Sequence, residues 1–116
     1  CAGSLSAGAH NNVPELARKY ASRTKFVHLR STDVLPGGNF KEASHLAGRA
    51  GIIDLVRTFQ KENPSLPMRV DHAPLMLGDE KMGYNAGYSF HGRMLALGQM
   101  EGVMAVVNRE IAEGKI

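Results

Sequence analysis

Hydrophobic and polar residues along this chain alternate in blocks that predict three helices and two short strands. Apolar residues recur at helical spacing on one face of the segments 11–21, 52–63 and 87–113. Between these segments, residues 24–31 and 66–73 are rich in β-branched and apolar side chains and end in turn-forming or polar groups, which is typical of strands. The predicted order is helix, strand, helix, strand, helix.

Capping residues support the first helix and turn-forming residues separate the elements. Asn12 is suited to an N-cap, and Pro14 lies in the first turn, where a missing backbone N–H has no cost. We expect the residues between the predicted elements to form loops, in segments 1–12, 32–51 and 74–86.

This alternation favours parallel strands joined by crossover helices, and therefore an α/β fold. Two parallel strands do not make a stable sheet alone, and a complete (βα)8 barrel needs about 250 residues. We therefore interpret residues 1–116 as a single partial domain, the last third of a TIM barrel. The start at a cysteine agrees with an excised piece, which we expect to be inactive alone. A doubly wound sheet is the alternative, although no Gly-x-Gly-x-x-Gly turn follows either strand.

The segment FVHLRS, residues 26–31, places unusual groups in the first predicted strand. Because side chains alternate between the faces of a strand, His28 and Arg30 point one way, and Val27 and Leu29 point the other. Charged and polar groups are costly to bury without partners. The polar face is therefore either a solvated edge or part of an active site, and alternation alone leaves both open.

Composition narrows the class of protein. The chain is 43% hydrophobic and 22% charged, which is typical of a globular protein, and no apolar run reaches the roughly 20 residues of a membrane helix. Its formal charge of +3 is scattered rather than gathered with aromatic residues, which argues against nucleic-acid binding. A single cysteine excludes an internal disulfide and fits a reducing compartment.

Reactive side chains stand where the predicted strands end, in a loop that follows, or where the last helix begins, and barrels carry catalytic groups at strand ends and in the loops after them. They are Cys1, His28, Arg30, His45, Asp71, His72 and Tyr88. A thiolate, an imidazole and a carboxylate from successive strand ends can bind one divalent ion. Mixed sulfur, nitrogen and oxygen ligands suit Mn, Fe(II), Co or Zn better than Mg or Ca.

Each of these residues also has a simpler interpretation when taken alone. Cys1 is a small side chain that proteins often bury as an apolar group. His28 can be a hydrogen-bonded histidine at a strand end, and Asp71 can cap the last helix or pair with a nearby arginine. Arg30 can be a solvated charge, and His45 can satisfy backbone groups of its own loop.

Five ordered motifs resemble the D-mannonate dehydratase family. They are CAGSL, FVHLRS, FKEASHLAG, MRVDHA and NAGYSFHGRMLALGQMEGV. The chain departs from the family pattern at Ala73 and Pro74, where many members have glycine and then histidine or arginine, and at Ala86, where proline is common. The segment 74–87 is also longer, which leaves Tyr84 as an alternative to Tyr88.

The resemblance implies a metal-dependent hydro-lyase on a TIM barrel similar to the xylose isomerase group. It would remove water from D-mannonate to give 2-keto-3-deoxy-D-gluconate in hexuronate (glucuronate) breakdown, with Mn²⁺ or Fe²⁺. The motif matches imply metal ligands Cys1, His28 and Asp71, an acid/base pair His72 and Tyr88 whose roles stay open, and substrate contacts Arg30 and His45.

The same resemblance implies a cytoplasmic enzyme that forms a homo-oligomer when full-length. A small sugar acid would be its partner, with neither nucleic acid nor membrane. The alternatives are another metal-dependent sugar or sugar-acid isomerase or lyase on the same barrel, or an inactive fragment of such an enzyme.

Overall fold

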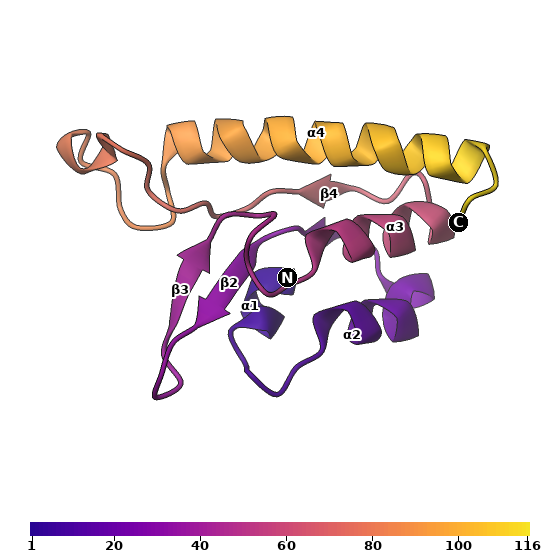
Figure 1. Cartoon of the computed structure of the whole chain (residues 1–116), viewed down its shortest axis with the longest axis horizontal. Helices are drawn as coiled ribbons and strands as arrows, with labels where there is room; N and C mark the ends of the chain where they lie inside the picture. Colours follow the sequence, from indigo (N-terminus) through magenta and orange to yellow (C-terminus); the bar gives the residue numbers. More distant parts are fainter.

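In the computed structural model, which describes residues 1–116, the long helix α4 lies above a short parallel strand pair and three further helices (Figure 1). The regular elements are α1 (Ala2–Ser6), α2 (Val13–Tyr20), β1 (Val27–His28), β2 (Ser31–Val34), β3 (Phe40–Ala43), α3 (Ile52–Glu62), β4 (Met68–Arg69) and α4 (Phe90–Ala112), with 3₁₀ turns η1 (Ala21–Arg23) and η2 (Asp79–Lys81).

The two predicted strands pair in parallel, as the alternation of elements indicated. Val27 lies opposite Met68 and His28 opposite Arg69. The Leu29 amide also donates to the Arg69 carbonyl at 2.7 Å. Each strand is only two residues long, shorter than predicted, and the chain supplies no other strand to this sheet.

Side chains of residues 27–30, which comprise β1 and the two residues after it, alternate between a buried face and a partly exposed face, as predicted. Val27 is 5% exposed and Leu29 is 1% exposed, and both belong to the core. His28 and Arg30 are partly exposed on the other face. The polar pair therefore lies opposite the core-facing pair.

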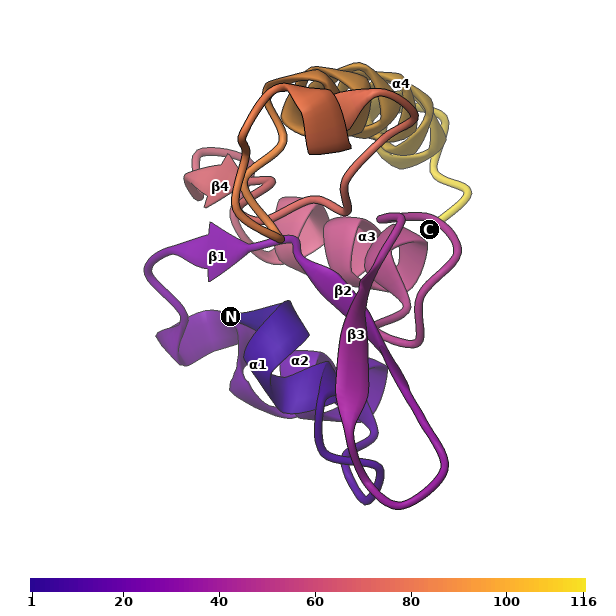
Figure 2. The same ribbon diagram turned by 90° about the vertical axis from the view of Figure 1, so that its left-hand side faces the viewer.

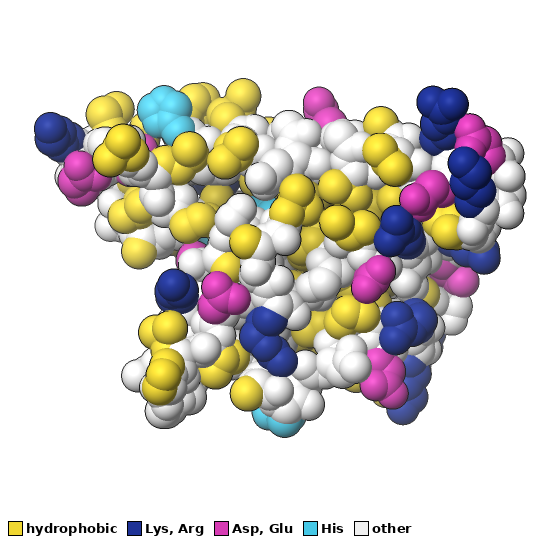
Figure 3. Space-filling model, viewed as in Figure 1, with side chains coloured by type: hydrophobic (Ala, Val, Ile, Leu, Met, Phe, Trp, Pro, Cys, Tyr) yellow, Lys and Arg dark blue, Asp and Glu magenta, His cyan; other side chains and the backbone are white.

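The core forms where the apolar stripes of the helices meet the parallel strands. The Asn12 side chain accepts a hydrogen bond from the Glu15 amide at 3.2 Å, so the predicted N-cap of α2 is confirmed. Leu55 and Val56 of α3 are almost fully buried in one cluster with residues of α2 and α4. Apolar side chains also form a band between α4 and α3 on the surface (Figure 3).

Two segments predicted to be loops are regular, and the loop predictions for them are wrong. Residues 2–6 form α1, and residues 31–43 form the antiparallel β2–β3 hairpin. The hairpin turns at Gly37 and Gly38, whose φ angles are +87° and +91°, a conformation that favours glycine. Figure 2 shows the hairpin projecting away from the helices.

Buried hydroxyl groups explain why the hairpin was missed. Ser6 and Thr32 are fully buried, and their hydroxyl oxygens lie 2.8 Å apart. The Ser6 hydroxyl also donates to the Gly3 carbonyl, and Ser31 accepts from the Ala50 amide. Because these polar residues are satisfied by distant partners, the β2 sequence does not show the apolar alternation of a strand.

None of the helices combines the length and the apolar character required to span a bilayer.

Candidate active site

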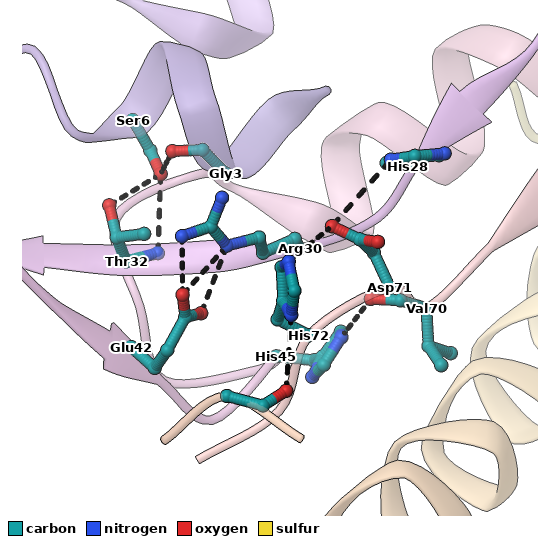
Figure 4. A network of polar contacts seen from close by, with 11 residues as sticks. Gly3, Ser6, His28, Arg30, Thr32, Glu42, His45, Val70, Asp71 and His72 are labelled. Atoms are coloured by element: carbon teal, nitrogen blue, oxygen red, sulfur yellow. Dashed lines mark hydrogen bonds and ion pairs between the residues drawn. The ribbon is translucent and has the colours of Figure 1, made fainter. Parts of the chain in front are cut away.

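The parallel pairing brings three predicted ligands together at the carboxyl ends of β1 and β4. Cys1 precedes α1, His28 ends β1, and Asp71 follows β4. One ligand atom from each of them lies within 4.8 Å of the other two. His28 Nδ1 is 3.6 Å from Asp71 Oδ2 (Figure 4). The structure thus assembles a sulfur, a nitrogen and an oxygen donor from three separate segments.

Asp71 adopts a left-handed backbone conformation. Its φ of +59° is the one positive φ among the non-glycine residues. Such a conformation costs about 1–2 kcal/mol for a residue with a Cβ, although aspartate tolerates it better than most. Backbone strain of this kind persists where the surroundings hold it, often at functional sites.

The residues present fit a divalent metal ion. Thiolate, imidazole and carboxylate are the donor types that Mn, Fe(II), Co or Zn accept. Cys1 is exposed, so the alternative of a buried apolar cysteine is wrong. Ser89, rather than Asp71, caps the last helix, which removes helix capping as the role of Asp71. Asp71 does lie near Arg69, at 3.7 Å.

His72 and Tyr88 lie next to this cluster and against each other. Their rings are 4.6 Å apart at 82°, an edge-to-face contact. The Gly87 carbonyl lies 3.2 Å from His72 Nδ1, and because a carbonyl can only accept, the proton of the neutral ring is on Nδ1. His72 Nε2 is 3.8 Å from the Asp71 carboxylate. Tyr88, rather than Tyr84, is therefore the tyrosine that contacts His72.

Arg30 is held by a carboxylate that the sequence did not single out. Its Nε lies 2.9 and 3.0 Å from the two Glu42 oxygens, and its Nη2 also donates to Glu42. This hydrogen bonding raises the pKa of Arg30 above its ordinary value. The third guanidinium nitrogen, Nη1, makes no hydrogen bond within the chain. Glu42 thus fixes the guanidinium plane and leaves one edge of it available.

Gly3 is required by the path of Arg30. A Cβ at position 3 would lie 2.3 Å from Arg30 Cγ, closer than any real contact. The aliphatic part of Arg30 therefore crosses α1 directly over Gly3. This close approach explains why position 3 is a glycine.

Arg30, Glu42, His72 and Tyr88 line one open cleft of about 580 Å³. Phe40 and Lys41 of β3 complete one wall, and Pro74, Leu75, Ala86 and Gly87 complete the other. The two walls come from the hairpin and from the loop that precedes α4, whose backbones are drawn in Figure 2. Since His72 contacts both this cleft and Asp71, the cleft borders the donor cluster.

His45 does not line this cleft. It is 2% exposed, and its Nε2 lies 2.7 Å from the Val70 carbonyl oxygen (Figure 4). Of the two interpretations left open by the sequence, the structure supports the one in which His45 satisfies a backbone group. That backbone group belongs to the end of β4 rather than to the loop of His45.

A buried carboxylate that the sequence did not single out organises the loop before α4. Asp79 is 1% exposed, accepts from the Met76 amide at 2.7 Å and from the Ser89 hydroxyl, and lies 3.4 Å from His91 Nδ1. The Ser89 hydroxyl, and then the Met76 amide, lower the pKa of Asp79 below its usual value. Ser89 in turn caps α4 by accepting from the Gly92 amide at 2.8 Å.

Comparison with known proteins decides the family. A family model described as D-mannonate dehydratase (UxuA) matches residues 1–113. The chain belongs to the D-mannonate dehydratase family. The predicted resemblance is therefore confirmed.

Individual members of the D-mannonate dehydratase family agree. The chain is 36% identical over 120 residues to mannonate dehydratase 2 of Agrobacterium fabrum, covering 96% of this chain and 30% of that protein. It is 36% identical over 115 residues to a mannonate dehydratase of Saccharophagus degradans, covering 90% of this chain and 29% of that protein. The chain thus spans about 30% of the length of these relatives.

A solved structure shares the fold. The crystal structure of a mannonate dehydratase from Streptococcus suis serotype 2 superposes with a TM-score of 0.83 at 23% identity. The match covers 97% of this chain and 32% of that structure. The predicted α/β fold is confirmed by this match.

Proposed function

We propose that the full-length protein carrying this chain is a D-mannonate dehydratase. It would remove water from D-mannonate to give 2-keto-3-deoxy-D-gluconate in glucuronate catabolism. The observation that carries this proposal is the convergence of Cys1, His28 and Asp71 beside the His72–Tyr88 pair, in a chain of this family. Relatives that are themselves named mannonate dehydratase support it.

Cys1, His28 and Asp71 would hold Mn²⁺ or Fe²⁺, because their donor types and their 4.8 Å grouping suit such an ion. When bound, the ion would supply Lewis-acid stabilisation of negative charge on the substrate oxygens. The chain's own task is to keep the three donors facing one point. The β1–β4 pairing and the left-handed backbone of Asp71 do this.

His72 and Tyr88 would move the protons. Dehydration removes the proton at C2, beside the carboxylate, and expels the hydroxyl at C3, so one group must accept a proton and another must donate one. The Gly87 carbonyl fixes the proton of neutral His72 on Nδ1, which leaves Nε2 able to accept. The Tyr88 hydroxyl can donate, and the opposite assignment is also compatible with the edge-to-face contact.

Arg30 would contact the oxygens of the sugar acid. Its Nε and Nη2 are bound by Glu42, so the available donor is Nη1, facing a defined direction. The carboxylate of Glu42 offsets the charge of the guanidinium. We therefore propose that Arg30 orients the substrate through directional hydrogen bonds more than through net charge.

The wider architecture follows from the same proposal. Residues 1–116 would form one partial domain, the last third of a TIM barrel, with β1 and β4 as neighbouring barrel strands. Parallel pairing of two short strands that each end in reactive groups supports this assignment. We further propose a cytoplasmic homo-oligomer that acts on a small sugar acid, with neither nucleic acid nor membrane as partner.

Product analysis of the full-length protein tests the function. With Mn²⁺ or Fe²⁺, D-mannonate should lose one water and give 2-keto-3-deoxy-D-gluconate, and a chelator should abolish turnover. D-Gluconate, which differs in configuration at C2, is the control substrate and should react much more slowly. A product of unchanged mass would instead identify an isomerase and overturn the proposal.

A further inference from the structure

The Val70 carbonyl lies just beyond the end of the β1–β4 ladder. The last ladder bond runs from the Leu29 amide to the Arg69 carbonyl, and β4 ends at Arg69. Val70 is nevertheless buried, at 8% exposure. A buried carbonyl needs a hydrogen-bond partner, and the ladder supplies none at this position.

His45 provides that partner from the loop that follows β3. Its Nε2 is 2.7 Å from the Val70 oxygen, across 25 positions of sequence. Because the carbonyl can only accept, Nε2 must carry the proton. The His45 ring is 2% exposed, so neighbouring side chains fix its orientation and water does not compete for this bond.

The bond acts on the peptide unit that leads into Asp71. The Val70 carbonyl and the Asp71 amide lie in one rigid peptide plane. The φ of Asp71 is the rotation about its N–Cα bond relative to that plane. A hydrogen bond that fixes the carbonyl therefore fixes the reference plane for this rotation. That φ is +59°, a left-handed value that persists only where the surroundings determine it. The Asp71 side chain that follows this peptide has its Oδ2 3.6 Å from His28 Nδ1.

We propose that His45 is a positioning residue, which holds the Val70–Asp71 peptide so that the Asp71 carboxylate faces His28. This inference rests on the metal site of the proposed function and gives His45 a role other than substrate contact. His45 does not line the substrate cleft, and its side chain makes no hydrogen bond to a ligand side chain; it acts through one backbone carbonyl. Removing its donor leaves that carbonyl buried and unpaired and releases the strained backbone.

Variants of the full-length protein separate the donor from the side-chain volume. His45→Leu removes the donor at similar volume, His45→Asn carries a donor too short to reach, and His45→Gln places an N–H near the original Nε2. His10→Leu, at an exposed histidine, is the control. The readouts are the Mn²⁺ dissociation constant from chelator competition, and amide hydrogen exchange of residues 68–73 in the metal-free protein.

We expect His45→Leu and His45→Asn to weaken Mn²⁺ binding about 10- to 100-fold, the usual effect of losing an outer partner of a metal ligand. Exchange at residues 68–73 should accelerate in both. His45→Gln should recover most of the affinity and protection, and His10→Leu should match the wild type. If His45→Leu does not fold, the Asn and Gln pair still makes the comparison.

Two outcomes would overturn the inference. One is wild-type Mn²⁺ affinity and wild-type exchange in the Leu or Asn variant. The other is a raised KM for D-mannonate at unchanged Mn²⁺ affinity, which would make His45 a substrate contact. A wild-type protein that binds no metal would contradict the proposed function instead, and the exchange data on metal-free protein would still decide whether His45 holds this strand end.

Discussion

The two walls of the cleft, the β2–β3 hairpin and the loop of residues 74–88, are held in different ways. The hairpin has four register pairs and is joined to α1 by the contact between Ser6 and Thr32. Arg49, shortly after the hairpin, donates to the carbonyl of Ser6 at the end of α1 and to those of Gly8, Ala9 and Asn11 in the segment that follows it. This wall is fixed by many separate interactions.

The loop wall has no strand ladder, and its backbone hydrogen bonds are mostly those of local turns and of its two ends. One isolated bridge joins Ala73 to Tyr88, and one buried carboxylate, Asp79, ties the middle of the loop to the start of α4. Gly78 and Gly87 both have positive φ within or at the end of this segment. A wall with few constraints opens at lower free energy than one with many.

The two halves of the proposed reaction therefore have different structural support. Arg30 extends along the constrained wall, where Glu42 fixes its guanidinium. Tyr88 lies at the end of the less constrained wall, in contact with His72. The proposed substrate contact, Arg30, is thus held by redundant contacts, whereas the proposed proton-transfer pair depends on the correct placement of one loop.

The largest effect is expected at the proton-transfer pair on the loop side. His72→Asn and Tyr88→Phe should each lower kcat about 10²- to 10⁴-fold, the usual contribution of general acid–base catalysis. Both variants of the full-length protein should retain stoichiometric metal, measured by elemental analysis. Tyr84→Phe is the matched control and should be nearly as active as the wild type. Near-normal kcat in either of the first two variants would remove that residue from the mechanism.

A smaller effect is expected on the hairpin side. Glu42→Gln replaces the charged partner of Arg30 by a neutral amide that can accept fewer of its hydrogen bonds. A hydrogen bond to a charged group contributes about 1.5–3 kcal/mol, so KM for D-mannonate should rise about 10- to 100-fold, with a smaller change in kcat. Glu62→Gln, at an exposed glutamate, is the control. Equal kinetic constants for the two variants would show that Glu42 does not position Arg30.

The contact between α1 and Arg30 gives a stability test of the same wall. Gly3→Ala should destabilise the full-length protein by about 1–3 kcal/mol, because its new Cβ would overlap the stem of Arg30. In the Arg30→Ala background the same substitution should cost much less. Urea unfolding of the two single variants and the double variant measures this coupling. Additive losses would mean that the methyl group meets something other than Arg30.

The smallest effect, and the one specific to the loop, is its response to acid. Because the folded pKa of Asp79 is lowered, ionised Asp79 stabilises the loop above the ordinary aspartate pKa of about 3.9. That stabilisation is lost as the pH falls through the lowered value. His91, at 3.4 Å, adds a favourable charge when protonated.

Hydrogen exchange of residues 74–89 checks this response. Protection should persist from neutral pH to about pH 4 and fall below it, and the hairpin should change less. Asp79→Asn should reduce protection at neutral pH and remove the acid transition of the loop. The same acid profile in Asp79→Asn would exclude Asp79 as its cause.

Local signals were sufficient for part of the fold. The Asn12 cap and the apolar stripes predicted α2 and α3, and the alternation from Val27 to Arg30 predicted which side chains face the core. The hairpin and α1 were missed because their polar residues, such as Thr32, are buried through partners distant in sequence. No local pattern reports such partners.

The candidate site divides in the same way. Cys1, His28 and Asp71 could be proposed because barrels gather reactive groups at strand ends and because the motifs resemble one family. Glu42 and Asp79 were missed because each resembles an ordinary solvated carboxylate until the fold supplies its partner. His45 could be selected as a candidate from the sequence, but its hydrogen-bond partner, the Val70 carbonyl, could not be predicted.

The proposed ligand set is tested by the absorption spectrum of the Co²⁺-substituted full-length protein, with the wild type compared with Cys1→Ser. If Cys1, His28 and Asp71 bind one ion, the wild type should show a sulfur-to-cobalt charge-transfer band. The Cys1→Ser variant should still bind Co²⁺, with lower affinity, and should lack this band. An identical band in Cys1→Ser would contradict the assignment of Cys1 as a ligand and, with it, the proposed metal centre.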